Sequence, residues 1–151
     1  MALLKKLTEF VENGPPSQTS TYHGSREAAA DLVKVDIVGE SSYQKELGQL
    51  AGPKLYDGVS KWLLASLTPD PANPYDENAV AVSIQGFKVG YLARPMAKAF
   101  QHMMISAGMA GEDLTEIDAE IRGGWSRGND EGHFGVALYL PESVAKQLGV
   151  T

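Results

Sequence analysis

Short runs of alternating apolar and polar residues constrain the fold of this chain more than any other feature. In the segment 32–38, Val33, Val35 and Ile37 alternate with Lys34 and Asp36. Three further segments, 80–84, 87–91 and 115–122, repeat this period of two. A period of two is typical of β-strands with one buried and one exposed face. The alternation therefore predicts a protein built mainly from short strands.

The segment 80–91 gives the strongest hairpin signal. Gln85-Gly86 separates two alternating runs, and the second run is expected to place Phe87, Val89 and Tyr91 on one face. Short helices are predicted for 41–52, closed by Gly52-Pro53, and for 93–105, with Pro95 in the first turn. Strands at hairpin spacing with one or two inserted short helices predict an all-β protein, a small closed or half-closed β-barrel.

The N-terminal part has a different character. Residues 3–12 place leucines, a phenylalanine and a valine on one helical face and charges on the other. Because an isolated helix of this length is marginal in water, it must dock. The first interpretation is docking on its own domain or on a sister subunit in a homodimer, and the alternative is binding to a partner or to a membrane surface. Residues 13–25 resemble a flexible linker. We expect an appendage at 1–31 and the barrel domain at 32–151.

Composition narrows the classes of function. The 151 residues contain no cysteine, which excludes disulfides, thiol nucleophiles and cysteine-ligated metals. Thirteen basic and nineteen acidic residues give a net charge of −6, which argues against holding duplex DNA or an anionic membrane by bulk charge. The sequence carries no signal-peptide pattern and no apolar stretch of about 18 residues or more. We expect a cytoplasmic protein without a membrane partner.

The densest local signal is the segment Asp70–Asn78, DPANPYDEN. Its two prolines restrict the backbone, and aspartate and asparagine side chains accept hydrogen bonds from nearby amides in turns. One interpretation is a rigid turn before a strand. The other is a fixed polar-aromatic cluster formed by Asn73, Tyr75 and Asp76. The histidines are isolated and no hydrolase motif occurs, so neither a metal, a cofactor nor a catalytic set is expected.

The glycine-rich segment 123–135, GGWSRGNDEGHFG, is expected to be a long loop. Arg122 precedes this segment, and Trp125, Arg127 and His133 lie within it.

The segment Asp70–Arg94, with VDIVGESSYQKEL upstream, resembles the HIRAN domain. The resemblance covers about 32–140. It rests on the N-P-Y-D-x-N-A-V turn and the V-G-Y-L sequence after the hairpin. Members of this family are fused to helicase-like DNA translocases and nucleases or stand alone. The resemblance implies an OB-like barrel that captures the 3′ end of single-stranded DNA without catalysis, with a DNA-processing enzyme as a further partner.

The resemblance also implies roles for individual residues. Asp76 corresponds to the aspartate that accepts a hydrogen bond from the terminal 3′-hydroxyl, while Arg94 corresponds to a phosphate-contacting lysine. The other implied DNA-binding residues are Tyr43, Asn73, Tyr75, Tyr91 and Phe134.

One departure from the family concerns the first loop. Ser41 and Ser42 stand where eukaryotic members carry an arginine and a further tyrosine. A cation and a stacking surface are therefore missing there, and stacking is worth about 1–3 kcal/mol per base. This departure and the acidic composition leave an alternative open: a protein-interaction or adaptor module on the same fold, without DNA binding.

Overall fold

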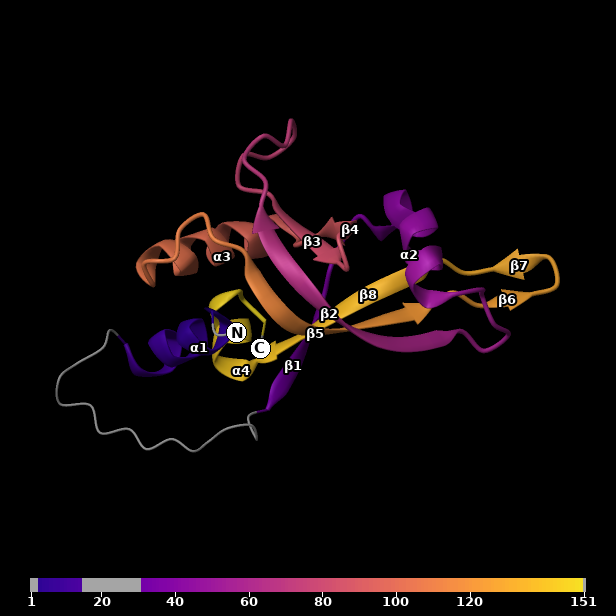
Figure 1. The fold of residues 1–151 in the computed structure, drawn as a ribbon, viewed down its shortest axis with the longest axis horizontal. Helices are drawn as coiled ribbons and strands as arrows, with labels where there is room; N and C mark the ends of the chain where they lie inside the picture. The colour runs from indigo at the N-terminus through magenta and orange to yellow at the C-terminus, as the bar shows by residue number, and fades with distance from the viewer. Residues whose placement is uncertain (1–2, 15–30, 151) are drawn as a thin grey trace.

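Six strands form one antiparallel sheet in the computed structural model, which describes residues 3–14 and 31–150 (Figure 1). In spatial order the strands are β1 (Leu32–Asp36), β8 (Phe134–Pro141), β5 (Leu114–Gly123), β2 (Val59–Pro69), β3 (Val80–Ile84) and β4 (Phe87–Tyr91). The alternating segments thus form strands, and the expected all-β class is confirmed.

The two edges of this sheet meet just after β1. Val38 and Tyr91 exchange two backbone hydrogen bonds, with N···O distances of 2.8 and 2.9 Å. Gly90 lies against this contact, because a Cβ atom on Gly90 would be 2.6 Å from the Val38 carbonyl oxygen. A short bridge between the edge strands therefore closes the sheet into a barrel-like shape, and it depends on glycine at position 90.

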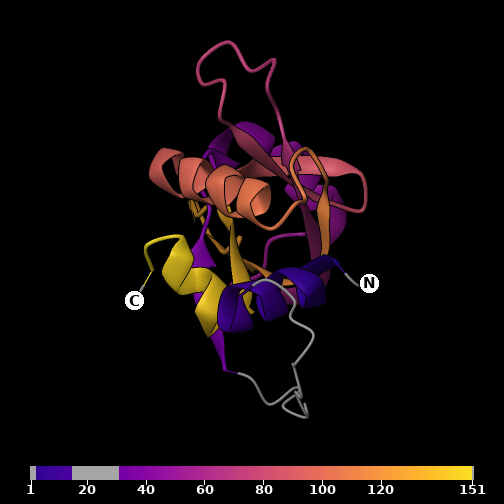
Figure 2. The same ribbon diagram turned by 90° about the vertical axis from the view of Figure 1, so that its left-hand side faces the viewer.

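Helices cover the ends of the sheet. They are α1 (Leu3–Asn13), α2 (Gln44–Ala51), α3 (Arg94–Ser106) and α4 (Glu142–Gln147), and a 3-10 turn η1 (Glu40–Tyr43) precedes α2. The predicted inserted helices correspond to α2 and α3. Figure 2 shows α1 and α4 side by side at one end of the sheet, below α3. None of the helices in the described ranges is long and apolar enough to cross a membrane.

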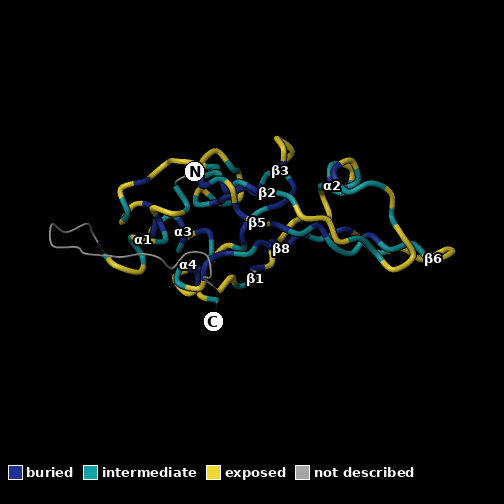
Figure 3. Tube along the Cα trace, turned by 60° about the horizontal axis from the view of Figure 1, so that its bottom comes forward, coloured by how far each residue is buried: buried dark blue, intermediate teal, exposed yellow. Residues whose placement is uncertain are grey.

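The barrel interior forms one continuous core. It contains the inward-facing residues of all six strands together with Phe100, Met103 and Met104 of α3. Figure 3 shows the buried chain concentrated in the central strands. On β2 the alternation sends Trp62 and Leu64 outward, with 55% and 54% of their surface exposed. The sheet therefore keeps an uncovered outer face.

Helix α1 docks on its own chain. Leu7 is fully buried in the barrel core, and α1 contacts β5 and α4. Ser143 of α4 donates a hydrogen bond of 3.1 Å to the Glu12 carboxylate. Of the docking alternatives, the structure has the intrachain one. The linker predicted after residue 13 lies mostly outside the described residues, and the division at residue 31 stays a prediction.

The glycine-rich segment differs from the expectation of a long loop. It forms a two-stranded extension, β6 (Ser126–Arg127) and β7 (Asp130–Glu131), that continues the hairpin of β5 and β8 (Figure 1). Glycines with positive φ at positions 123, 124 and 128 turn the backbone here, and glycine adopts this geometry without a steric penalty. Frequent glycines thus shape a twisted hairpin rather than an open loop.

Candidate nucleic-acid interface

The turn between β2 and β3 is held by its own polar side chains. The Asn73 Oδ1 atom accepts hydrogen bonds from the backbone amides of Tyr75 and Asp76, at 2.8 and 3.2 Å. One Asp76 oxygen, Oδ1, accepts from the Asn78 amide at 2.9 Å. These are the side-chain turns that aspartate and asparagine favour. The segment therefore projects from the barrel as a fixed loop (Figure 1).

Arg94 at the start of α3 braces the tip of this loop. Its guanidinium donates a hydrogen bond of 2.9 Å to the Tyr75 carbonyl oxygen and lies 3.9 Å from Asp76 Oδ2. The Asp76 side chain is 20% exposed and the Arg94 side chain 72% exposed. The Tyr75 residue is 82% exposed. The loop thus presents a carboxylate, a guanidinium and an aromatic ring next to one another.

A second group of side chains lies beside the loop; we call it the tyrosine–lysine cluster, formed by Tyr43, Asp70, Lys88 and Tyr91. The Tyr91 hydroxyl donates to Asp70 Oδ2 at 3.1 Å and accepts from Lys88 Nζ at 2.9 Å. Lys88 Nζ is 3.8 Å from the same Asp70 oxygen. Asn73 Nδ2 reaches Asp70 Oδ2 at 3.5 Å, so Asn73 joins this cluster to the loop.

Tyr43 joins the cluster through its hydroxyl. Partial burial raises the pKa of Tyr43, and its hydrogen bond with Tyr91 acts in the same direction. The hydrogen bond from Lys88 to Tyr91 raises the pKa of the Lys88 ammonium. Both directions mean that the tyrosine stays neutral and the lysine stays cationic throughout the neutral range. The cluster therefore holds one fixed cation, Lys88, next to the Asp70 carboxylate.

Sequence reasoning missed Lys88 because of a β-bulge. In the pairing of β3 with β4, Val82 faces Gly90 and Ser83 faces Lys88, so Val89 has no partner of its own. A bulge shifts the alternation by one residue. Lys88 and Tyr91 therefore meet through their side chains, whereas strict alternation assigned them to opposite faces. The only sequence signal was the glycine at position 90, because glycine inside a strand often marks a bulge.

The position of Lys88 bears on the first loop. Ser41 and Ser42 are exposed in η1 and bring neither a charge nor a ring. The charge of Lys88 acts on the Tyr43 hydroxyl, and Tyr43 directly follows Ser42 in the chain. A cation from β4 thus stands close to the loop that lacks its own.

Phe134 lies apart from the other candidate residues. It is only 4% exposed, and its ring packs on Gly124, where a Cβ atom would be 2.2 Å from the ring. Its backbone amide and carbonyl form hydrogen bonds with the Gln44 side chain at 2.8 and 2.9 Å. Phe134 therefore anchors α2 on β8, and little of its ring reaches solvent.

The candidate residues thus fall into two linked groups and one outlier. Asn73, Tyr75, Asp76 and Arg94 form the loop site, and Tyr43 and Tyr91 belong to the neighbouring tyrosine–lysine cluster. Phe134 is separate. Within the described residues, no three histidine, aspartate or glutamate side chains gather in a way that could hold a metal ion.

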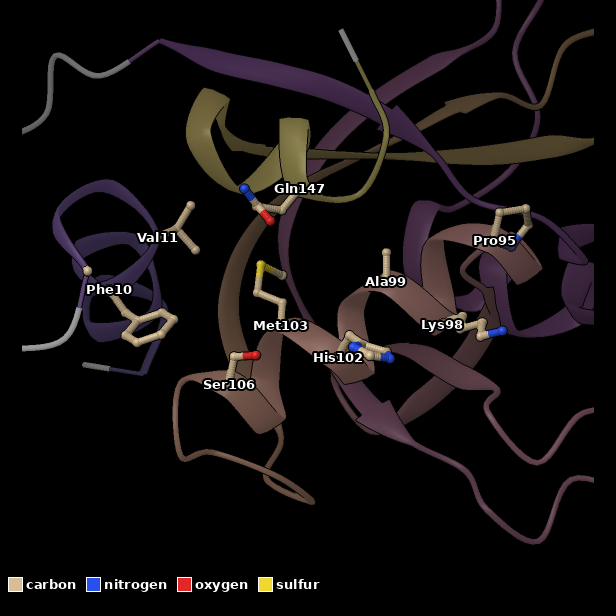
Figure 4. Close-up of a pocket in the computed structure, with 10 residues that line it drawn as sticks. Phe10, Val11, Pro95, Lys98, Ala99, His102, Met103, Ser106 and Gln147 are labelled. Atoms are coloured by element: carbon tan, nitrogen blue, oxygen red, sulfur yellow. The ribbon is translucent and has the colours of Figure 1, made fainter.

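A groove of about 670 Å³ lies on another side of the molecule, between α1, α3 and α4 (Figure 4). Its floor includes Phe10, Val11, Ala99 and Met103, and Lys98 and His102 lie along α3. None of the loop-site residues lines it. The groove is an apolar surface feature separate from the polar site.

Comparison with known proteins finds one matching domain family, over part of the chain. Residues 56–120 match the family model of the HIRAN domain, and this match confirms the resemblance drawn from the sequence. Two solved structures are similar to the chain. The crystal structure of the HIRAN domain of human HLTF has 20% identity and a TM-score of 0.36, with 80% of this chain and 90% of that chain covered. The NMR structure of the HLTF HIRAN domain in its DNA-bound conformation has 21% identity and a TM-score of 0.38, with 83% and 92% covered. No curated protein matches the sequence significantly.

Proposed function

We propose that this protein binds the 3′-hydroxyl end of single-stranded DNA without catalysing a reaction, and that the loop site recognises this end. The observation that carries the proposal is the half-buried Asp76 carboxylate beside the Arg94 guanidinium and the exposed Tyr75 ring. The HIRAN family match over residues 56–120 supports the same class of ligand.

The charge arrangement favours a hydroxyl over a phosphate at the strand end. Asp76 Oδ1 is occupied by the Asn78 amide, and Oδ2 remains available to accept a further hydrogen bond. A 3′-hydroxyl can donate to this oxygen, whereas a 3′-phosphate would bring two negative charges together in a partly dry site. A penultimate phosphate can contact Arg94 instead.

Aromatic side chains supply the rest of the affinity in this proposal. Bases stack on aromatic rings with little sequence preference, and each stacked base contributes about 1–3 kcal/mol. Tyr75 offers an exposed ring at the loop, while Tyr43 and Tyr91 lie beside it with the Lys88 cation. A protein of net charge −6 can thus bind a short strand end through a small local cationic site.

The test compares strands that differ only at their 3′ end. Fluorescence anisotropy with a 5′-labelled ten-nucleotide strand should give tighter binding to the 3′-hydroxyl form than to the 3′-phosphate form. In Asp76→Asn the side-chain oxygen can still accept from the Asn78 amide, so the turn should persist while the charge is lost. We expect this variant to lose about tenfold in affinity for the hydroxyl end. Asp118→Asn, on the exposed face of β5, is the matched control and should change nothing.

Two results would contradict the proposal. Equal affinity of the wild type for both ends would rule out recognition of the hydroxyl group. No binding to either strand at tens of micromolar protein would rule out the DNA function altogether.

The uncovered outer face of the sheet favours a second candidate, a protein-binding function. Trp62 packs against Tyr139 in a tilted arrangement with ring centres 4.9 Å apart, and Leu64 is exposed on β2. Asp118 and Glu120 of β5 pair directly with Leu64 and Trp62 across the strands. Apolar groups between carboxylates fit a partner segment that carries both apolar and cationic side chains.

A peptide titration tests this second candidate. In a Trp125→Phe background, Trp62 is the remaining tryptophan. Its emission should shift to shorter wavelength on addition of a peptide of alternating leucine and lysine, and not with a peptide of alternating leucine and glutamate. An unchanged emission with both peptides would speak against the outer face as a binding surface for basic segments.

A further inference from the structure

A stack of aromatic and cationic side chains lies at the β6–β7 hairpin, away from the loop site. The Arg127 guanidinium is 5.1 Å from the centre of the Tyr56 ring and 4.9 Å from the centre of the Trp125 ring. Arg127 Nε also donates a hydrogen bond of 2.9 Å to the Tyr56 carbonyl oxygen. We call Tyr56, Trp125 and Arg127 the hairpin stack.

The backbone holds this stack in place. Leu55 donates to the Gly124 carbonyl at 3.1 Å and accepts from the Ser126 amide at 2.9 Å, so the segment before β2 is fixed against the hairpin. On the hairpin, the Trp125 ring lies directly on Gly132, because a Cβ atom there would be 2.2 Å from the indole nitrogen. The rings are therefore positioned before any ligand arrives, which lowers the entropic cost of binding.

The chemistry of the stack suits single-stranded nucleic acid. Tyr56 is 68% exposed, so much of its ring is open to solvent. Among the residues that the structure describes, no carboxylate lies within ion-pair distance of Arg127, whereas Lys54 is paired with Glu131 at 3.0 Å. An exposed ring can stack a base, and an arginine without an acidic partner can contact a phosphate.

A continuous series of contacts connects the stack with the loop site. Tyr43 of the tyrosine–lysine cluster is followed by Gln44, which bonds to the backbone of Phe134. Lys54 lies over the Phe134 ring at 5.7 Å, two residues before Tyr56. In Figure 1, α2 occupies the space between β4 and the hairpin. The tyrosine–lysine cluster, which adjoins the loop site, therefore lies before α2 in the chain, at Tyr43, and the hairpin stack begins after it, at Tyr56.

We propose that the hairpin stack is a second subsite of the same interface, which stacks a base of single-stranded DNA several nucleotides before the captured 3′ end. This inference rests on the proposed function of the loop site. Exposed carboxylates lie next to the stack, because Asp57 follows Tyr56 in the chain and Asp130 and Glu131 pair with Arg127 and Ser126 across the hairpin. The stack is therefore unsuited to the dense phosphates of a duplex and takes unpaired bases instead. The subsite makes binding depend on strand length.

The test measures affinity against strand length. Strands of 4, 8 and 12 nucleotides, each with a 5′ label and a 3′-hydroxyl, are titrated with wild-type protein, Tyr56→Ala, Tyr56→Phe and Asp76→Asn. The wild type should bind the 12-nucleotide strand about tenfold more tightly than the 4-nucleotide strand. Tyr56→Ala should remove this gain and leave the affinity for the 4-nucleotide strand unchanged. Tyr56→Phe keeps the ring and should retain the gain.

Asp76→Asn separates the two proposals. It should weaken binding of every strand by the same factor and leave the dependence on length intact. If all strands bind the wild type equally, or if Tyr56→Ala weakens the 4-nucleotide strand as much as the 12-nucleotide strand, the second subsite is overturned while the loop site stands. If no strand binds, both proposals fail.

Discussion

Replacing Gly90 with alanine should lower the free energy of unfolding by about 2–4 kcal/mol. A Cβ atom at this position would lie 2.6 Å from the Val38 carbonyl oxygen and 2.8 Å from Ile37 Cδ1. These distances are too short, so β4 must move away from the chain that follows β1. The two hydrogen bonds between Val38 and Tyr91 that close the barrel would then lengthen or break.

Thermal and chemical denaturation measure this effect. The melting temperature should fall by roughly 5–15 °C. Gly48→Ala is the matched control, because the nearest atom to its new Cβ would be at 3.8 Å and the residue lies inside α2. Alanine is favoured over glycine in a helix interior by about 0.5–1 kcal/mol, so this variant should be slightly more stable than the wild type. A Gly90→Ala protein as stable as the wild type would show that closure does not depend on this contact.

If the proposed function is right, Gly90→Ala should also weaken binding of the 3′-hydroxyl strand in the anisotropy assay, beyond its effect on stability. Tyr91 follows Gly90 directly and holds Asp70, Lys88 and Tyr43 together through its hydroxyl. Closure of the barrel and assembly of the tyrosine–lysine cluster therefore depend on the same two residues of β4.

The sequence predicted the elements whose signals are local. Alternation identified four of the six sheet strands, β1, β3, β4 and β5. The polar turn Asp70–Asn78 formed with its own side chains as partners, as aspartate and asparagine chemistry suggested. At this turn the structure places Asn73, Tyr75, Asp76 and Arg94 next to one another. The interactions within the turn join residues close in the chain, whereas Arg94 reaches the turn from the start of α3, nineteen positions after Tyr75.

The features that the sequence did not predict depend on long-range contacts. The bulge at Val89 appears only when β4 pairs with β3, and it is what joins Lys88 to Tyr91. The hairpin stack requires Tyr56, some seventy positions before Arg127, to be fixed against the extended β6–β7 hairpin. Phe134 was assigned by resemblance through a glycine-rich segment, where the register is weakly specified.

Replacing Leu7 with alanine should lower the free energy of unfolding by about 2–5 kcal/mol, a cost typical of a fully buried leucine. The side chain is completely buried, and α1 packs on β5 and α4 with Leu3, Leu4 and Val11 against the same core. The truncation leaves a cavity that rigid strands on one side cannot fill. If residues 1–31 are instead a separate appendage, the opposite is expected: a substitution in α1 leaves the melting temperature of the barrel unchanged.

Circular dichroism during thermal unfolding distinguishes these alternatives. If α1 belongs to the cooperative unit, Leu7→Ala shifts one single transition to lower temperature, and Lys6→Ala, an exposed position on the same helix, leaves it in place. If α1 is an appendage, the main transition stays unchanged and only a small helical signal is lost at low temperature. Leu7 belongs to the same buried core as residues of β5 and α3, which favours the first outcome. Truncating a side chain in a shared core destabilises every element that packs on it.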